Sequence, residues 1–362
     1  MVIGASAAGL ATAACLRRLG QDHVLLEGGR SVGAAWRTHY ERLHLHTNKG
    51  SSALPFVPFG RGVPRYASRT EVVDYLERYA AETGVAPRFN QTVTHVHRDA
   101  DAWVTRTDLQ TYRSRNVVVA TGMARQPVVP DWSGGETYPG EVLHSSAYRN
   151  GTPWFGQRVL VVGFGNSAGE IAIDLHEHGA SPTLAVRSAV NVIPRELLGI
   201  PILLIGSVLS VLPPRVADAL GAPLVAASVG DLRRLGLRKL PYGPIQQIHR
   251  DRHIPLIDIG TIAHVRAGHI AVRGGVTALT ATGARFDDGT EEPYDAIVAA
   301  TDPRSRTSST RRTRSTTPER RGRADARPHP VCTSAGSTCP RSACSSRSAS
   351  KRSGSAGRSP DR

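Results

Sequence analysis

Two glycine-rich turns, each lying between an apolar run and a helical pattern, constrain this chain more than any other feature. The first turn begins at Gly4 and the second at Gly163. A strand, a glycine turn and a helix in succession form the βαβ unit that binds dinucleotides in doubly wound α/β proteins. Two such units predict two nucleotide sites, and a chain of 362 residues is long enough for two domains.

The first turn runs from Gly4 to Gly9 and follows the apolar residues 1–3. Gly4 permits the tight turn, and Gly9 permits close packing of the helix on the strand. Ser6 stands where a middle glycine usually lets the backbone approach a phosphate, and a small serine can still fit. Glu27 ends the next strand, where a carboxylate can accept both ribose hydroxyls of an adenosine. We therefore expect a dinucleotide here; the alternative is a purely structural glycine turn.

The second turn keeps glycine at three positions, Gly163, Gly165 and Gly169, with one extra residue before the last. Asn166 and Ser167 lie between the second and third of these glycines. All five residues are therefore expected to contribute to a second nucleotide site.

The strand after the second turn ends in Arg187 and Ser188 rather than in an acid. A carboxylate would repel a 2′-phosphate, whereas a guanidinium and a hydroxyl can bind it. This site is therefore expected to prefer NADPH over NADH; the alternative is that Arg187 is a solvated charge at a strand end.

Two different dinucleotides in one chain suggest an electron relay, in which NADPH reduces a flavin held by the first unit.

The composition changes sharply near residue 301. Residues 301–362 hold 15 Arg and Lys against four acids, and they contain no Leu, Ile, Met, Phe, Tyr or Trp. Such a segment cannot bury enough apolar surface to offset the entropy of ordering it, so residues 302–362 are predicted to be a disordered basic tail. The abrupt change resembles out-of-frame translation and predicts a frameshift near codon 302. The alternative is a basic arm that binds nucleic acid or anionic membrane by charge alone, without specific nucleic-acid recognition.

The cysteines and the apolar runs bear on metals, membranes and location. Three of the four cysteines lie in the tail and none forms a CxxC pair, so no metal site is expected. No signal peptide is evident, which favours a cytoplasmic setting. The strand at residues 1–3 is short, so we expect a few residues to precede it.

Residues 197–212 are apolar but interrupted by Gly and Pro. They predict a buried helix pair or pocket wall, with superficial membrane contact as the alternative and no transmembrane span.

The segment from Tyr138 to Tyr148 has an aromatic residue at each end, Gly140 two positions after the first and His144 four positions before the second. It resembles the identifying motif of flavin-containing monooxygenases, and it lies between the two glycine turns as in that family. Further stretches resemble the plant YUCCA-type indole-3-pyruvate monooxygenases, namely Val129–Pro130, Arg158–Gly163, Val192–Gly199, Pro255–Thr261 and Phe286–Gly289. The resemblance covers residues 1–301.

This resemblance implies an α/β protein with two Rossmann-like domains, residues 1–151 for FAD and residues 152–301 for NADPH. It also implies a class B flavoprotein, in which NADPH reduces FAD and O2 adds to the flavin C4a to give a (hydro)peroxide. That species transfers one oxygen to a small organic substrate while NADP⁺ stays bound. In the YUCCA group the substrate is a 2-oxo acid, which loses CO2 after attack. Oligomeric state does not follow from the resemblance.

The resemblance also suggests roles for individual residues. Asn48 lies where the monooxygenases carry an Asn near the flavin C4a; the alternative is an ordinary loop residue. Trp36 belongs to a Gly-x-x-Trp stretch expected beside the flavin. Thr121 and Gly122 end a run predicted to be a buried strand near FAD. His144 is expected to brace the domain junction, with a direct acid–base role as the less favoured alternative.

The chain departs from the family pattern after Thr301, where Asp302 and Pro303 replace the usual Gly and Tyr. The family then returns to the flavin domain with a strand and a helix that cover part of the flavin site, and residues 302–362 could not supply them. Two alternatives to a monooxygenase therefore stay open. One is a flavin reductase or oxidase that releases H2O2, and the other is an inactive frameshifted fragment.

Overall fold

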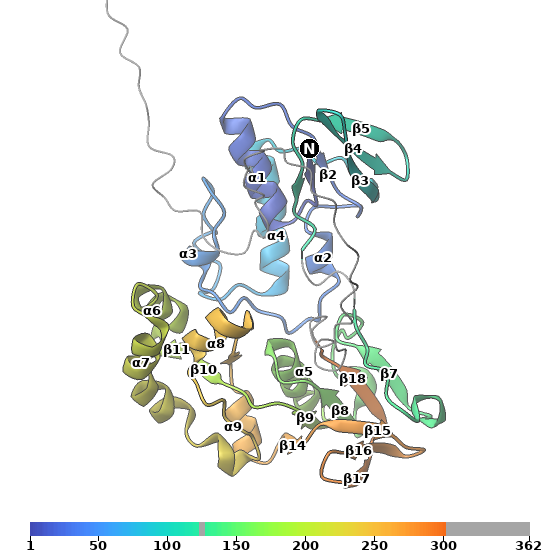
Figure 1. The fold of residues 1–362 in the computed structure, drawn as a ribbon, viewed down its shortest axis with the longest axis vertical. Coiled ribbons are helices and arrows are strands. Elements are labelled where there is room, and N and C mark those ends of the chain that lie inside the picture. Colours follow the sequence, from blue (N-terminus) through green and yellow to red (C-terminus); the bar gives the residue numbers. More distant parts are fainter. Residues whose placement is uncertain (123–126, 302–362) are drawn as a thin grey trace, which may run out of the picture. The chain divides into compact units, whose positions relative to one another are not determined.

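The computed structural model describes residues 1–122 and 127–301, which belong to one compact unit. Residues 302–362, which are predicted to be disordered and frameshifted, lie outside the described residues. The described chain is a mixed α/β fold, in which two parallel sheets are each flanked by helices (Figure 1).

The first sheet has the strand order β2-β1-β6 and is parallel. β1 (Val2–Ile3) pairs with β2 (Leu25–Leu26) on one side and with β6 (Val118–Val119) on the other. Helix α1 (Ala7–Arg18) connects β1 to β2, so the predicted strand, helix and strand of the first unit are confirmed. The core here joins β1 and β2 to α1 and α4, because parallel strands need apolar cover on their faces.

Helix α4 (Arg69–Thr83) has strong signals at both ends. The Ser68 hydroxyl accepts a hydrogen bond from the Glu71 backbone N–H at 3.3 Å, and the Glu71 carboxylate accepts one from the Ser68 N–H at 2.7 Å. This capping box satisfies two backbone donors that the helix would leave unpaired. Gly84 ends the helix with φ +65°, a conformation that favours glycine. Short helices α2 (Ala34–Arg37) and α3 (Lys49–Ser52) precede α4.

A strand was expected within residues 117–122 and is confirmed at β6, but the expectation that it is buried was wrong. The side chains of Val118 and Val119 are 38% and 65% exposed. β6 is the last strand of its sheet in the described chain, so one of its edges is unpaired there. A separate antiparallel sheet, β3 (Val93–Asp99), β4 (Ala102–Thr107) and β5 (Thr111–Ser114), precedes β6 in the chain.

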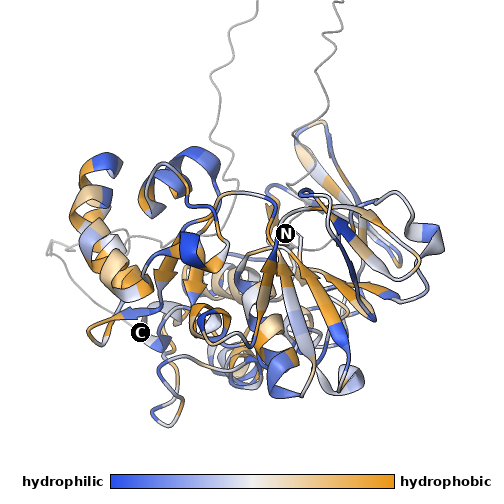
Figure 2. Ribbon diagram, turned by 90° about the horizontal axis from the view of Figure 1, so that it is seen from below, coloured by the Kyte–Doolittle hydropathy of each residue, from blue (hydrophilic) through white to orange (hydrophobic). Residues whose placement is uncertain are grey.

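The second sheet has the order β14-β9-β8-β18-β7 and is also parallel. Its strands are β7 (Glu141–His144), β8 (Arg158–Val162), β9 (Ser181–Ala185), β14 (Ala271–Arg273) and β18 (Ala296–Ala299). Helix α5 (Asn166–Glu177) joins β8 to β9 and buries eight of its twelve residues. β8, β9 and β18 contribute side chains to the same hydrophobic core as α5. Figure 2 shows orange, hydrophobic segments in both strands and helices of the fold. β7 belongs to this sheet although it precedes residue 151.

Two further groups of elements complete the second half of the chain. An antiparallel sheet is formed by β15 (Val276–Leu279), β16 (Gly283–Phe286) and β17 (Glu291–Pro293). β10 (Val192–Pro194) pairs in parallel with β13 (Leu256–Asp258). The segment between β10 and β13 contains β11 (Glu196–Leu197), β12 (Ile200–Pro201), α6 (Ile202–Leu209), α7 (Pro214–Val229) and α8 (Pro244–Asp251), and α9 (Thr261–Arg266) follows β13.

The predicted burial of residues 197–212 was wrong. Helix α6 has no buried residue, and Leu198, Val208 and Val211 are 91%, 72% and 84% exposed. An apolar run forms a core only where other elements cover it, and the described residues cover this one on one side only. No helix in residues 1–122 and 127–301 is both long and apolar enough to cross a membrane.

Candidate functional site

The first glycine turn brings the chain so close to β6 that side chains are excluded. A Cβ atom on Gly4 would lie 2.6 Å from the Ala120 carbonyl oxygen, and one on Gly9 would lie 1.8 Å from the Gly4 carbonyl oxygen. Gly4 also has φ +103°. Ser6, in contrast, is extended (φ −106°, ψ −165°), and its hydroxyl makes no capping hydrogen bond to α1. Serine therefore fits without backbone strain, and the N-terminus of α1 can accept an anion.

Glu27 is directed at this turn. One carboxylate oxygen accepts a hydrogen bond from the Ala5 N–H at 2.6 Å, and the other accepts one from the Gly29 N–H at 2.8 Å. The carboxylate thus holds the turn to the end of β2. Each oxygen has a further lone pair, which is compatible with the predicted binding of ribose hydroxyls.

The other residues predicted near the flavin lie around the same turn. The Gly33 N–H donates to the Ala5 carbonyl at 3.1 Å, which holds α2 and its partly buried Trp36 beside the turn. Thr121 and Gly122 follow β6 and are exposed. Because the carboxyl ends of parallel strands meet at one edge of a sheet, these segments converge where a nucleotide binds in such folds.

The second glycine turn repeats the geometry of the first. Gly163 has φ +129°, and a Cβ atom there would lie 2.4 Å from the Ala300 carbonyl oxygen. Gly165 is extended like Ser6 (φ −106°, ψ −176°), and the space around its Cβ position is open. Helix α5 begins at Asn166, three residues after Gly163, as α1 begins three residues after Gly4.

This equal spacing corrects the sequence interpretation of the second turn. There is no extra residue before the last position, because the counterpart of Gly9 is the buried Ala168 and not Gly169. A Cβ atom on Gly169 would lie 2.7 Å from the Thr261 hydroxyl, so this glycine lets α9 approach α5. The glycine spacing therefore assigned the last position of the turn to Gly169 instead of Ala168.

Asn166 and Ser167 make contacts to distant segments. The Asn166 side-chain oxygen accepts a hydrogen bond from the Ile257 N–H at 2.9 Å, which holds β13 beside the turn. Tyr40 packs in the core of the second half of the chain, with its ring 6.4 Å from that of Tyr148. Burial raises the pKa of the Tyr40 hydroxyl, with a further contribution from Glu170, and outweighs the lowering by the nearby Ser167 side chain, so Tyr40 is neutral.

Arg187 and Ser188 follow β9 and are exposed. The Arg238 guanidinium donates to the Arg187 carbonyl oxygen, which brings a second cation to the position of the first. Sequence reasoning missed Arg238, because it is distant in the chain from the turn and no local pattern marks it. Two guanidinium groups beside a nucleotide turn favour binding of an added phosphate.

A buried contact joins the loop before α3 to helix α5. The His46 Nε2 atom lies 2.7 Å from a Glu170 carboxylate oxygen, and the two side chains are 15% and 1% exposed. His46 Nδ1 and the other Glu170 oxygen have no hydrogen-bond partner among the described residues. Buried polar atoms of this kind usually bind a ligand or water, so they are consistent with a site between the two turns.

His144 lies where the two strands β7 and β18 end. Its Nδ1 atom accepts a hydrogen bond from the Ser146 N–H at 3.1 Å, and its Nε2 atom lies 3.4 Å from the Thr301 carbonyl oxygen. Both ring nitrogens thus contact protein atoms. The flanking aromatic residues are buried, and the Tyr148 hydroxyl donates to Asp174 at 2.5 Å. The geometry favours the bracing role over an acid–base role.

Asn48 is the N-cap of α3. Its side-chain oxygen accepts a hydrogen bond from the Ser51 N–H at 3.0 Å, which is the ordinary role of an asparagine at this position. Asn48 also lines a cavity of about 370 Å³ together with Lys49, Arg65, Pro201 and Leu204. The predicted pocket wall is therefore present at Pro201 and at Leu204 of α6, although α6 has no buried residue.

The charges around this cavity are mainly positive. Lys49 donates to three backbone carbonyl groups between residues 60 and 63. Arg65 donates through one nitrogen, Nη1, to Glu196 at 2.9 Å and to the Gly199 carbonyl at 2.8 Å. The hydrogen bond from Arg65 lowers the pKa of the Glu196 carboxyl, so this pair stays ionised. Arg195 stacks over Tyr66 at 4.1 Å and, like Arg65, lowers the pKa of the Glu196 carboxyl, so two arginines lie near this one acid.

The chain is similar to known proteins in sequence and in fold. The family model described as pyridine nucleotide-disulphide oxidoreductase matches residues 1–194. The indole-3-pyruvate monooxygenase YUCCA1 of Oryza sativa subsp. japonica is 40% identical over 310 residues, which cover 84% of this chain and 76% of that protein. The probable indole-3-pyruvate monooxygenase YUCCA1 of Arabidopsis thaliana is 38% identical, covering 83% of this chain and 74% of that protein.

Solved structures share the fold. The flavin-containing monooxygenase from Stenotrophomonas maltophilia has a TM-score of 0.62 at 24% identity, covering 83% of this chain and 76% of that one. The cyclohexanone monooxygenase from Rhodococcus sp. Phi1, bound to NADP⁺, has a TM-score of 0.64 at 18% identity, covering 83% of this chain and 70% of that one. At these identities the likeness supports the fold.

The His46–Glu170 contact leads to a prediction about stability. The substitution His46→Ala should lower the free energy of unfolding by about 3 kcal/mol, because it leaves a buried carboxylate without its partner. Glu170→Gln should cost less, since an amide can still hydrogen-bond to the imidazole. Urea unfolding followed by tryptophan fluorescence measures both. The exposed His249→Ala variant should stay within about 0.5 kcal/mol of the parent, and an equal effect of His46→Ala and His249→Ala would contradict the structural role of the pair.

Proposed function

We propose that this chain is an NADPH- and FAD-dependent monooxygenase acting on an aromatic 2-oxo acid. The proposal starts from the family, because the chain belongs to the flavin-containing monooxygenase superfamily and within it to the YUCCA type. One observation carries the proposal. One glycine turn is associated with a carboxylate and the other with guanidinium groups, and the His46–Glu170 contact connects the two halves of the chain that carry these turns. In this proposal residues 1–151 form a Rossmann-like FAD domain, except that β7 joins the second sheet, and residues 152–301 form a Rossmann-like NADPH domain.

The residues present fit the two cofactors. At the first turn the cradle formed by Gly4 and Gly9 excludes side chains, and the N-terminus of α1 is open for the pyrophosphate of FAD. At the second turn the open space at Gly165 and the cations Arg187 and Arg238 suit NADPH. The bound cofactors supply hydride transfer to the flavin and activation of O2; in this proposal the oxygen passes through the flavin C4a-(hydro)peroxide that the resemblance implies.

The protein groups position these cofactors and the substrate. We assign Asn48 to the neighbourhood of the flavin C4a, which its place in the cavity wall supports. Trp36, Thr121 and Gly122 contribute to the flavin side. His144 acts as a positioning residue at the junction, because both of its ring nitrogens contact protein atoms.

The cavity beside Asn48 suggests the class of substrate. Arg65 supplies a positive charge that can bind a carboxylate, and Pro201 and Leu204 supply an apolar wall for an aromatic ring. A 2-oxo acid with an aromatic side chain combines these two features. The rice relative is named for indole-3-pyruvate, which has this chemistry.

An alternative proposal, a flavin oxidase that releases H2O2, is favoured by a different observation. Val119, Thr121 and Gly122 are exposed at the end of β6, next to the first turn. Water at a reduced flavin promotes loss of H2O2, because oxygen transfer depends on exclusion of solvent. Product analysis therefore has to separate oxygenated product from H2O2.

A cytoplasmic location with superficial membrane contact completes the proposal. From residue 197 to residue 229 the only charged residues are Arg215 and the buried Asp218. The α7 side chains of Val216, Leu220 and Leu224 are 47%, 58% and 49% exposed, in line with the exposed α6 residues. An apolar helical surface of this kind can enter the headgroup region of a bilayer without crossing it.

The preference for NADPH can be tested at Arg187. The substitution Arg187→Glu should reduce kcat/KM for NADPH on the order of ten- to a hundredfold and should affect NADH much less, because a carboxylate repels the 2′-phosphate. Stopped-flow flavin reduction with each nucleotide measures the ratio. Arg98→Glu, an equal charge change on an exposed residue of β3, serves as the control. An unchanged NADPH/NADH ratio in Arg187→Glu would exclude this residue from cofactor selection.

The substrate class can be tested by a coupled assay. Indole-3-pyruvate should stimulate NADPH consumption and release CO2 in proportion, whereas amines and sulfides should not. Arg65→Gln should raise KM for the 2-oxo acid about tenfold, since a hydrogen bond to a charged group contributes about 1.5–3 kcal/mol. H2O2 formed in an amount equal to the NADPH consumed, with no CO2, would instead support the oxidase.

Membrane contact can be tested with vesicles. The chain should float with vesicles of phosphatidylcholine and phosphatidylserine. The partition coefficient of a Val211→Glu, Leu220→Glu double variant between vesicles and buffer should be at least about tenfold lower, which corresponds to a loss of about 1.4 kcal/mol in the free energy of partitioning. Leu109→Glu changes an equally exposed residue in another part of the fold and is the matched control. Equal flotation of the double variant and the control would exclude the α6–α7 surface as the site of membrane contact.

A further inference from the structure

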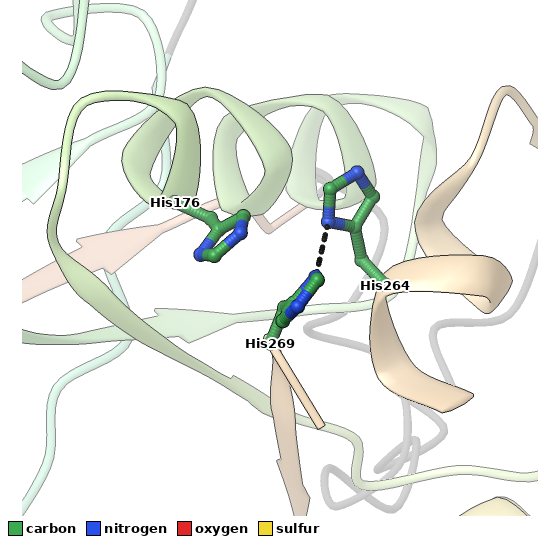
Figure 3. A group of neighbouring side chains, drawn as sticks. All are labelled: His176, His264 and His269. Carbon is green, nitrogen blue, oxygen red and sulfur yellow. Dashed lines mark hydrogen bonds between the residues drawn. The ribbon is translucent and has the colours of Figure 1, made fainter. Parts of the chain in front are cut away.

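Three histidines gather on the second half of the chain, away from both glycine turns. His176 lies near the C-terminus of α5, His264 lies in α9, and His269 lies in the connection from α9 to β14 (Figure 3). Their side chains point toward one another, and one ring nitrogen of each lies within 4.8 Å of those of the other two. The proposed function does not use any of these residues.

The spacing of the ring nitrogens is close to that of a metal site. The Nδ1 atoms of His264 and His269 are 3.3 Å apart. Two nitrogens that bind one zinc ion tetrahedrally at about 2.0–2.1 Å lie about 3.4 Å from each other. The third ring, His176, is stacked on His269 with centroids 4.4 Å apart. A rotation of side-chain torsions alone can therefore bring all three nitrogens to one ion.

The backbone that carries these rings is well anchored. Gly268 has φ +77° and turns the chain back at the end of α9, so that the His269 N–H donates to the His264 carbonyl at 3.0 Å. The next residue, Ile270, is 1% exposed and packs into the core. His176 extends from a helix whose other face is buried. A site on such elements needs little ordering when a ligand binds.

The surroundings of His264 favour its neutral imidazole, the form that binds metals. Burial lowers the pKa of His264, and the neighbouring His176 and His269 lower it further. Glu177 is the nearby acid that acts in the opposite direction, and it is engaged by Arg42 at 2.7 Å. Three imidazoles crowded together repel one another when protonated, and a metal ion removes that repulsion.

We propose that His176, His264 and His269 bind one divalent transition-metal ion of the zinc class, with solvent in the remaining position. Imidazole donors suit Zn²⁺, Co²⁺, Ni²⁺ and Cu²⁺ rather than Mg²⁺ or Ca²⁺. His176 is ten residues from Asn166, so the ion lies about 15 Å along α5 from the nucleotide turn. The ion therefore links α5, α9 and the connection to β14, and it takes no part in oxygen transfer.

Isothermal titration with ZnCl2, on the full chain after removal of any affinity tag, tests this site. The parent should bind one more equivalent of Zn²⁺ than the His176→Ala, His264→Ala, His269→Ala triple variant. His249→Ala, which removes an exposed histidine outside the cluster, should bind like the parent. The tail cysteines are present in every variant, so their contribution cancels. Zn²⁺ at tenfold its dissociation constant should raise the unfolding temperature of the parent by about 2 °C.

Two further measurements keep the result decisive. Because His269 is exposed, His269→Gln should fold normally and still bind Zn²⁺ at least tenfold more weakly than the parent. Co²⁺ should give visible absorption bands without the thiolate-to-metal charge-transfer band that cysteine ligands produce. Equal Zn²⁺ stoichiometry and affinity in the parent and the triple variant would overturn the proposal. So would a Co²⁺ spectrum that His269→Gln leaves unchanged.

Discussion

Both candidate nucleotide sites depend on one steric constraint, the approach of a glycine turn to the end of a neighbouring parallel strand. Gly4 lies against the carbonyl of Ala120 at the end of β6, and Gly163 lies against the carbonyl of Ala300 at the end of β18. A side chain at either glycine would push the turn away from the sheet. The N-terminus of the following helix would then point elsewhere, and its unpaired N–H groups could not face a phosphate.

The two candidate nucleotide sites can work together only if contacts hold the two halves of the chain to each other. The loop at residues 40–48 provides this coupling, because Tyr40 packs into the core of the second half and His46 is hydrogen-bonded to Glu170. Both contacts are buried, so each has a larger energetic weight than an exposed pair would have. The same loop carries Asn48 to the cavity wall. A polar contact between the two halves therefore also positions the proposed substrate site.

Two apolar surfaces remain exposed in the described chain, the end of β6 and the pair α6–α7. They differ in surroundings. The β6 surface lies beside the first glycine turn, where exposure affects the fate of a reduced flavin. The α6–α7 surface continues from the cavity wall at Pro201 and Leu204. A membrane that covers α6–α7 would lie next to the entrance of an apolar substrate.

The resemblance of the Tyr138–Tyr148 motif pointed to the family, and the local features could also be predicted from the sequence: the two strand–turn–helix units and the carboxylate and guanidinium that distinguish them. The two units follow from hydrophobic periodicity and from the φ values that glycine allows, which act over a few residues. Features that depend on distant segments are visible only in the tertiary structure. It paired His46 with Glu170, brought Arg238 to Arg187, exposed α6, and gathered three histidines from two helices and a turn. It also showed that Ala168, not Gly169, matches Gly9, because the helix start and not the glycine spacing sets the register. Burial and side-chain proximity are properties of the packed chain, so no local pattern could reveal them.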